Sequence, residues 1–249
     1  AMDSSGQLVA SILSKKIAAG STHLLIDIPV GASAKIHTNQ DALQLRKVFE
    51  YIGDQLGLHI EVVLTDGSQP IGNGIGPVLE AIDVEKVLKN QLDAPRDLRE
   101  KSLRLAGRIL EFDPDVRGGQ GYIIARDILE SGRAYEKMQA IITAQGVQAE
   151  TKGDAPLIHE IKAEKSGYVH AIDNFKISSI ASLAGAPIDK YAGIYLFKKV
   201  GDKVTKGEVL YKIYACFKSD FEFATQFATN NKAYSIDKCS PTCSDNYLL

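Results

Sequence analysis

Several features are missing from the sequence, and each absence excludes a class of protein. No apolar run approaches the roughly 18 residues of a membrane span, and no charged segment followed by an apolar one marks a secretion signal. The formal net charge is −2, so the composition does not favour a polyanionic partner. We therefore expect a cytoplasmic protein that binds neither a membrane nor a nucleic-acid polymer.

Cysteine is scarce and unevenly placed. Cys216, Cys239 and Cys243 all lie near the end of the chain. An odd number of cysteines, with none in the body of the chain, fits a reducing compartment. Cys239 and Cys243 have the spacing of half a zinc site, but no second pair of ligands lies nearby. We predict that the protein uses no metal and no cofactor.

Short catalytic motifs are also missing. The sequence contains no HExxH, no GxSxG and no phosphate-binding Gly-Lys-Ser/Thr loop. The glycine-rich stretch Gly72–Gly76 lacks the spacing of the dinucleotide fingerprint. It is either a tight structural turn or a loop that lines a substrate cleft, because loops at the carboxyl ends of strands shape α/β sites. Of the five histidines, only His37 is expected near a cleft.

The first part of the chain alternates between helical and strand patterns. Residues 7–18 and 41–56 have helical apolar spacing, and residues 24–29 and 59–65 are apolar runs typical of buried parallel strands. Strand, helix and strand in this order predict a right-handed βαβ unit. Further helices are predicted from about residue 78 and at 96–111, 122–131 and 134–145.

The texture changes after a polar linker at 147–156. Short strand-like runs, separated by Gly and Asp turns, are predicted at 158–163, 168–172, 193–198 and 209–214. They indicate a small antiparallel or barrel-like domain. Residues 217–249 show no periodicity, and we expect a loosely packed tail there. The fold class predicted is α/β, a mixed sheet with flanking helices, followed by a small β-rich C-terminal domain.

Four residues are candidates for a site. Ser11 and Lys15 are four apart on a predicted helix, so their side chains share a face. Lys35 lies in a loop of small residues after a buried strand, a suitable place for a cation that meets an anionic ligand. Asp3 precedes the first helix and could cap it or donate a proton. For the Ser/Lys pair and for Lys35, the alternative is an ordinary solvated surface.

Five stretches together resemble the thymidine (pyrimidine nucleoside) phosphorylases and the related archaeal AMP phosphorylases, over residues 3 to about 214. The stretches are Asp3–Gln7, Ala10–Gly20, Leu64–Gly72, Gly76–Ala81 and Ile128–Ala134. The resemblance implies transfer of a ribosyl group from a base to phosphate, which is a co-substrate. It also implies that the full-length enzyme is a homodimer.

The resemblance implies roles for the candidate residues. Ser11 and Lys15 match base-contacting residues of the nucleoside-specific branch. In the AMP branch, Asp3 matches a catalytic proton donor, and Ser11 and Lys35 match nucleotide-binding residues. A proton donor or cation near the departing base would lower the barrier, because negative charge builds on the base in the transition state. Where the nucleoside branch has Phe, this chain has Lys35, so thymidine and AMP both stay open as substrates.

The resemblance begins almost at residue 1, so we interpret the chain as the C-terminal half of an enzyme whose phosphate-binding residues lie upstream. We expect no activity from the chain alone, and a non-catalytic scaffold is a further alternative. The predicted domains are a remnant of a helical domain (1–20), an α/β domain (21–150), a β-domain (151–215) and the tail (216–249). Residues 201–213 resemble half of a biotinyl/lipoyl hammerhead but lack its modified-lysine turn, so Lys203 and Lys206 are expected to carry no cofactor.

Overall fold

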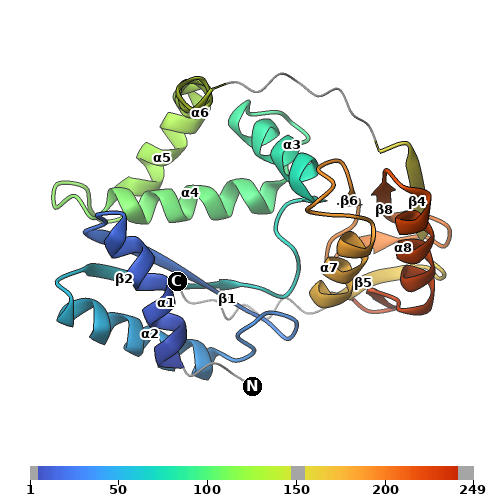
Figure 1. Cartoon of the computed structure of the whole chain (residues 1–249), viewed down its shortest axis with the longest axis horizontal. Coiled ribbons are helices and arrows are strands. Elements are labelled where there is room, and N and C mark those ends of the chain that lie inside the picture. The colour runs from blue at the N-terminus through green and yellow to red at the C-terminus, as the bar shows by residue number, and fades with distance from the viewer. Residues whose placement is uncertain (1–4, 147–154, 241–249) are drawn as a thin grey trace. The chain divides into compact units, whose positions relative to one another are not determined.

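The computed structural model describes residues 5–146 and 155–240 (Figure 1). It consists of two units. Of the described residues, the N-terminal unit comprises 5–68 and 104–123, and the C-terminal unit comprises 69–103, 124–146 and 155–240. Each unit is described by itself.

The N-terminal unit is built on two parallel strands. β1 (His23–Val30) pairs with β2 (His59–Asp66), in register from His23 opposite His59 to Val30 opposite Asp66. Helix α2 (Asn39–Gln55) connects the two strands, and α1 (Ser5–Ala18) precedes them (Figure 1). The predicted strand–helix–strand unit and the helix before it are therefore confirmed.

Apolar spacing in the two helices explains this packing. In α2, Ala42, Leu45 and Phe49 recur at helical intervals and are buried. The Thr38 hydroxyl caps the helix by accepting a hydrogen bond from the Asp41 amide at 3.1 Å. In α1, Val9 and Leu13 are buried and join the core formed by β1, β2 and α2.

Four further helices follow as the periodicity predicts. They are α3 (Pro77–Leu88), α4 (Arg96–Leu110), α5 (Gln120–Glu130) and α6 (Arg133–Gln145). The division between the units passes through α4 and α5. Gly107 of α4 and Gly121 of α5 lie backbone to backbone, since a Cβ atom on either would overlap the main chain near the other. Glycine allows this close approach of the two helices.

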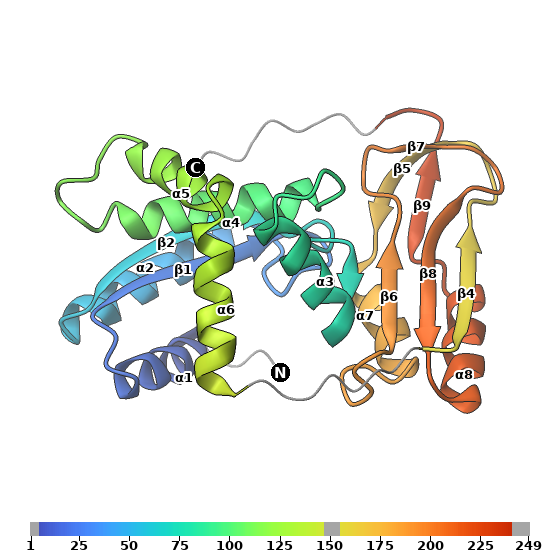
Figure 2. The same cartoon turned by 90° about the horizontal axis from the view of Figure 1, so that it is seen from above.

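The C-terminal unit contains two antiparallel sheets and two more helices (Figure 2). One sheet has the order β3 (Gly74–Ile75), β6 (Gly193–Leu196), β8 (Val209–Ala215), β4 (Leu157–Lys162). The other has the order β7 (Lys203–Val204), β5 (Gly167–Ile172), β9 (Tyr234–Asp237). Helices α7 (Asn174–Leu183) and α8 (Lys218–Asn230) share one hydrophobic core with both sheets.

The fold class is confirmed: the chain is an α/β protein with a small β-rich part. In the described residues, however, neither sheet closes into a barrel. The parallel pair forms a two-stranded sheet of its own, and the other strands pair antiparallel. The predicted domain boundaries remain a prediction.

The expectation of a loosely packed tail is wrong for residues 218–237. Helix α8 buries Ala224 and Ala228, and β9 pairs with β5. The apolar face of α8 gives little signal in the sequence, because alanines form much of it. Helix α7 is not among the predicted elements either, although Asp173 caps it by accepting a hydrogen bond from the Lys176 amide.

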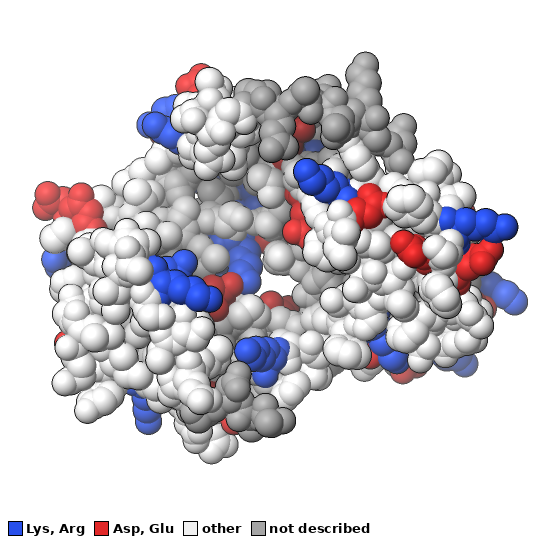
Figure 3. Space-filling view, in the orientation of Figure 1, with Lys and Arg blue, Asp and Glu red and all other residues white. Residues whose placement is uncertain are grey.

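Most of the predicted linker, residues 147–154, lies outside the described residues. Among the described residues, no helix has the length and apolar character needed to cross a bilayer. Positive and negative side chains are interspersed on the face shown in Figure 3, as the small net charge suggests.

Candidate functional site

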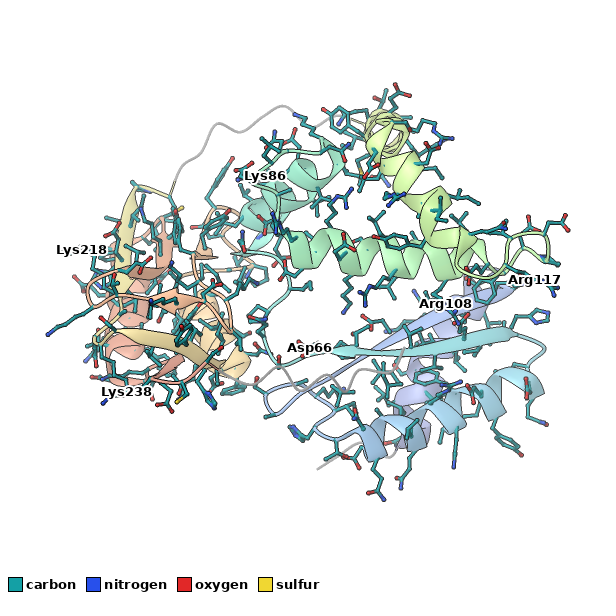
Figure 4. The ribbon with its side chains drawn as sticks, turned by 180° about the vertical axis from the view of Figure 1, so that it is seen from behind. Asp66, Lys86, Arg108, Arg117, Lys218 and Lys238 are labelled. Carbon is teal, nitrogen blue, oxygen red and sulfur yellow. The ribbon has the colours of Figure 1, made fainter. Side chains whose placement is uncertain are left out.

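The carboxyl ends of β1 and β2 form one edge of the parallel sheet. Because Val30 lies opposite Asp66, the loops after the two strands leave the sheet side by side. Asp66 is labelled in Figure 4 at the end of β2. The pairing continues one step past the strand, where the Gly67 amide donates to the Val30 carbonyl at 2.8 Å. This edge is where α/β folds place ligands, and it is where the sequence places Lys35.

The loop after β1 is closed on itself. The Gly31 amide donates to the Ile36 carbonyl at 3.1 Å, and the Ala34 amide donates to the Gly31 carbonyl at 3.0 Å. The His37 ring lies with Nδ1 3.2 Å from the Ala32 carbonyl. His37 therefore lies beside this loop, where its ring is exposed and helps to fix the backbone. Its place near a cleft remains a prediction.

Lys35 is exposed in this loop, and its ammonium group forms no ion pair with any residue that the structure describes. Its backbone neighbours on both sides are fixed, while its side chain is available. The geometry fits the prediction that a cation faces an anionic ligand here, but the role of Lys35 remains a prediction.

The loop after β2 also has its own internal support. The Asp66 carboxylate accepts a hydrogen bond from the Ser68 amide at 2.8 Å. On the facing strands, the Thr65 hydroxyl donates to the Asp27 carboxylate at 2.6 Å. These polar groups were not among the sequence candidates. Their position in the sequence could have indicated them, because each lies within a few residues of the carboxyl end of its strand.

Ser11 and Lys15 lie on the exposed side of α1, away from the buried positions Val9 and Leu13. The helix thus brings the two side chains to one face, as their spacing predicts. No hydrogen bond or ion pair within the described part of the chain joins them to Lys35. Asp3 lies outside the described residues, so the grouping of all four candidates remains a prediction.

The glycine-rich loop before α3 is held within the C-terminal unit. The buried Asp83 carboxylate accepts hydrogen bonds from the Asn73 amide at 2.6 Å and the Gly74 amide at 2.7 Å. The Lys199 ammonium donates to the Pro70 and Gly72 carbonyls and pairs with Asp97 at 3.0 Å. These bonds support the interpretation of a structural turn, because the loop's polar groups are used internally.

A pocket of about 660 Å³ lies within the C-terminal unit, among β4, β8, β9 and α8. Its lining combines apolar side chains such as Leu210 and Ile236 with charged ones such as Lys165. The Tyr211 side chain is buried at this pocket, and its hydroxyl has no hydrogen-bond partner in the described structure. Of the candidates that the structure describes, Ser11, Lys15 and Lys35, none lines this pocket.

The turn that resembles a hammerhead is also occupied internally. Lys198 pairs with Glu208 at 2.5 Å, and the Thr205 amide donates to the same carboxylate at 2.9 Å. The Lys198 ammonium first, and then the Thr205 amide, lower the pKa of Glu208 to about 2. Lys203 precedes this turn, Lys206 lies within it, and both are exposed. That they carry no cofactor remains a prediction.

The two cysteines that the structure describes give no indication of a site. Burial first, and then the neighbouring Asp189, raise the pKa of Cys216 to about 11, which disfavours the reactive thiolate. Cys239 is exposed and free, and Cys243 lies outside the described residues. No group of three metal-ligating side chains occurs in residues 5–146 and 155–240.

The family model and the similar proteins that match this chain indicate the same family. Residues 168–236 match the model of the pyrimidine nucleoside phosphorylase C-terminal domain. A protein of Methylococcus capsulatus named "Putative thymidine phosphorylase" is 60% identical over 235 residues, which are 94% of this chain and 46% of the relative. Proteins of the same name from Albidiferax ferrireducens and Rhodopseudomonas palustris are 57% and 56% identical, over 96% and 95% of this chain and 46% of each relative.

The chain belongs to the thymidine/pyrimidine nucleoside phosphorylase family. It spans about half the length of the curated relatives that it matches. The resemblance stated from the anchor stretches is therefore confirmed, and the β-rich C-terminal unit contains the domain that the family model describes.

Proposed function

We propose that this chain is part of a pentosyltransferase that converts thymidine and phosphate to thymine and 2-deoxy-α-D-ribose 1-phosphate. The observation that carries the proposal is the 60% identity to a relative named for this activity, over 94% of the chain. In this reaction the bond between the sugar and the base breaks, and phosphate forms the new bond to the sugar.

Ser11 and Lys15 are the proposed contacts to the base. They share the exposed face of α1, where a hydroxyl and an ammonium group can meet ring carbonyl oxygens. Asp3 is the proposed proton donor. Charge that develops on the departing base is stabilised by such groups when they are positioned in advance.

A substrate screen tests the proposal. The longer enzyme that contains this chain is incubated with phosphate and with thymidine, uridine, cytidine or AMP, and release of the free base is measured. We expect phosphate-dependent release, with the highest kcat/KM for thymidine. The proposal fails if no substrate releases its base in a phosphate-dependent manner.

AMP is the second candidate substrate, and Lys35 favours it. A nucleoside has no charge for this ammonium group to meet, whereas AMP offers a phosphate dianion. Such a charge-assisted contact contributes about 1.5–3 kcal/mol. In the longer enzyme, Lys35→Ala should then lower kcat/KM for AMP at least about tenfold more than for thymidine, a selective loss of about 1.4 kcal/mol.

Lys47→Ala is the matched control, because Lys47 is an exposed lysine of α2 away from the loop. Lys47→Ala should change kcat/KM for neither AMP nor thymidine. Equal losses on both substrates after Lys35→Ala, or no loss on either, would contradict a nucleotide-binding role of Lys35 and favour thymidine.

A further inference from the structure

Two glycines interlock the loops at the carboxyl edge of the parallel sheet. A Cβ atom on Gly31 would lie 2.6 Å from the carbonyl carbon and oxygen of Gly67 and 2.7 Å from the Ser68 nitrogen. A Cβ atom on Gly67 would in turn lie 3.0 Å from the Cβ atoms of Ala34 and Pro29. Each loop therefore occupies the space that a side chain on the other would need.

A displacement of one loop displaces the other at this contact, because both loops are also held at other points. The loop after β2 is held by the Asp66–Ser68 hydrogen bond and by the Gly67 amide on the Val30 carbonyl. The loop after β1 returns to the sheet through an isolated bridge between Val30 and Ile36. A shift at Gly31 cannot be absorbed by loose chain on either side.

Lys35 lies between two of these fixed points. Ala34, its neighbour on one side, faces Gly67, and Ile36, its neighbour on the other, forms the bridge to Val30. The Lys35 backbone is thus fixed while its side chain remains exposed. Fixing a binding group in advance lowers the entropy lost when a ligand is bound.

We propose that Gly31 and Gly67 are positioning residues that hold Lys35 where it meets the 5′-phosphate of a nucleoside monophosphate. The proposal rests on AMP as the second candidate substrate. In this proposal the two glycines affect the discrimination between nucleotide and nucleoside indirectly, through the position of Lys35. Adding a methyl group at Gly31 should displace the loop and weaken the contact to the phosphate without removing the lysine.

A double-mutant cycle on the 249-residue chain tests the proposal. Affinities for AMP and for adenosine, which differ only in the phosphate, are measured by NMR titration for the wild type, Gly31→Ala, Lys35→Ala and the double variant. We expect the wild type to bind AMP about tenfold more tightly than adenosine. Gly31→Ala and Lys35→Ala should each reduce this preference at least fivefold. In the Lys35→Ala background, Gly31→Ala should have no further effect on it.

Two further variants control for folding. Gly6→Ala adds a methyl group where nothing lies within 4 Å, and it should leave the AMP preference unchanged. Gly67→Ala perturbs the same contact from the other side and replaces Gly31→Ala if that variant does not fold.

Three results would overturn the proposal: additive effects of the two substitutions, an unchanged AMP preference in Gly31→Ala, or no AMP preference in the wild type. The proposed pentosyl transfer is tested separately, because base release from thymidine does not depend on a preference for AMP.

Discussion

The two units use their polar side chains differently. In the C-terminal unit, the charged groups Asp83, Lys199 and Glu208 are engaged in hydrogen bonds that hold its own loops. At the carboxyl edge of the N-terminal unit, the backbone is fixed mainly by main-chain contacts, and the Lys35 side chain is exposed. Chemistry is therefore to be sought where the backbone is fixed and the charged side chains are not used for structure.

The hydrophobic cores of the two units also differ. The C-terminal unit packs two sheets and two helices around side chains that are almost completely buried, including Ile180, Ile194 and Ile213. The N-terminal core rests on two strands covered by α1 and α2. We infer that the C-terminal unit is the stable scaffold of the chain.

The largest expected effect concerns this scaffold. Ile213 is fully buried on β8, and Ile213→Ala should lower the free energy of unfolding by about 2–5 kcal/mol, because it removes apolar contacts and leaves a cavity. Ile158→Ala is the control on the neighbouring strand, where Ile158 is 52% exposed. Denaturant titration measures the free energy of unfolding of both variants. Equal losses would contradict the assignment of Ile213 to the core of this scaffold.

The second prediction compares a charged residue from each unit. Asp83→Ala leaves the Asn73 and Gly74 amides without their acceptor and should cost about 1.5–3 kcal/mol of stability. Lys35→Ala should change stability by less than about 0.5 kcal/mol, because its side chain is exposed. The same unfolding experiment serves for both. A stability loss for Lys35→Ala as large as that for Asp83→Ala would show that Lys35 is structural.

The smallest expected effect is a dependence on pH. The pKa of Glu208 falls from its ordinary value of 4.5 to about 2 in the folded protein, so the carboxylate stabilises the fold above the ordinary value. This contribution is lost as the pH falls from 4.5 towards 2. Glu208→Gln should therefore weaken the acid destabilisation in this range.

Glu222→Gln is the control for this pH effect. The Glu222 carboxylate is exposed and lies 3.7 Å from the Lys218 ammonium. Unfolding midpoints measured across the acid range should be shifted by Glu208→Gln and not by Glu222→Gln. Parallel pH profiles for the wild type and Glu208→Gln would count against the role of the Lys198–Glu208 pair.

Elements with strong periodicity could be predicted from the sequence. The apolar stripe of residues 41–56 and the runs that became β1 and β2 gave their positions within a few residues. Helix α8 could not be recognised in this way, because alanines such as Ala224 provide much of its buried face. Strand β3 is two residues long and exists only through its pairing with β6, which no local pattern reveals.

The candidate site likewise has features that the sequence could predict and features that it could not. Lys35 could be placed at the sheet edge because it follows a recognisable strand. The contact between Gly31 and Gly67 joins loops 36 residues apart. It depends on the register of two strands, which the sequence does not specify. The use of Asp83 and Lys199 to hold a loop likewise depends on tertiary pairing.

We propose that this chain belongs to an enzyme that transfers a pentosyl group to phosphate. ³¹P NMR of thymidine and inorganic phosphate tests it most directly, with the 249-residue chain and the longer enzyme containing it measured side by side. We predict that a sugar 1-phosphate signal grows with the longer enzyme as thymine is released, and that the chain alone produces none. The proposal is contradicted if the folded longer enzyme forms no sugar 1-phosphate from either substrate. The spectrum would then show only inorganic phosphate with thymidine, and only inorganic phosphate and the 5′-phosphate of AMP with AMP.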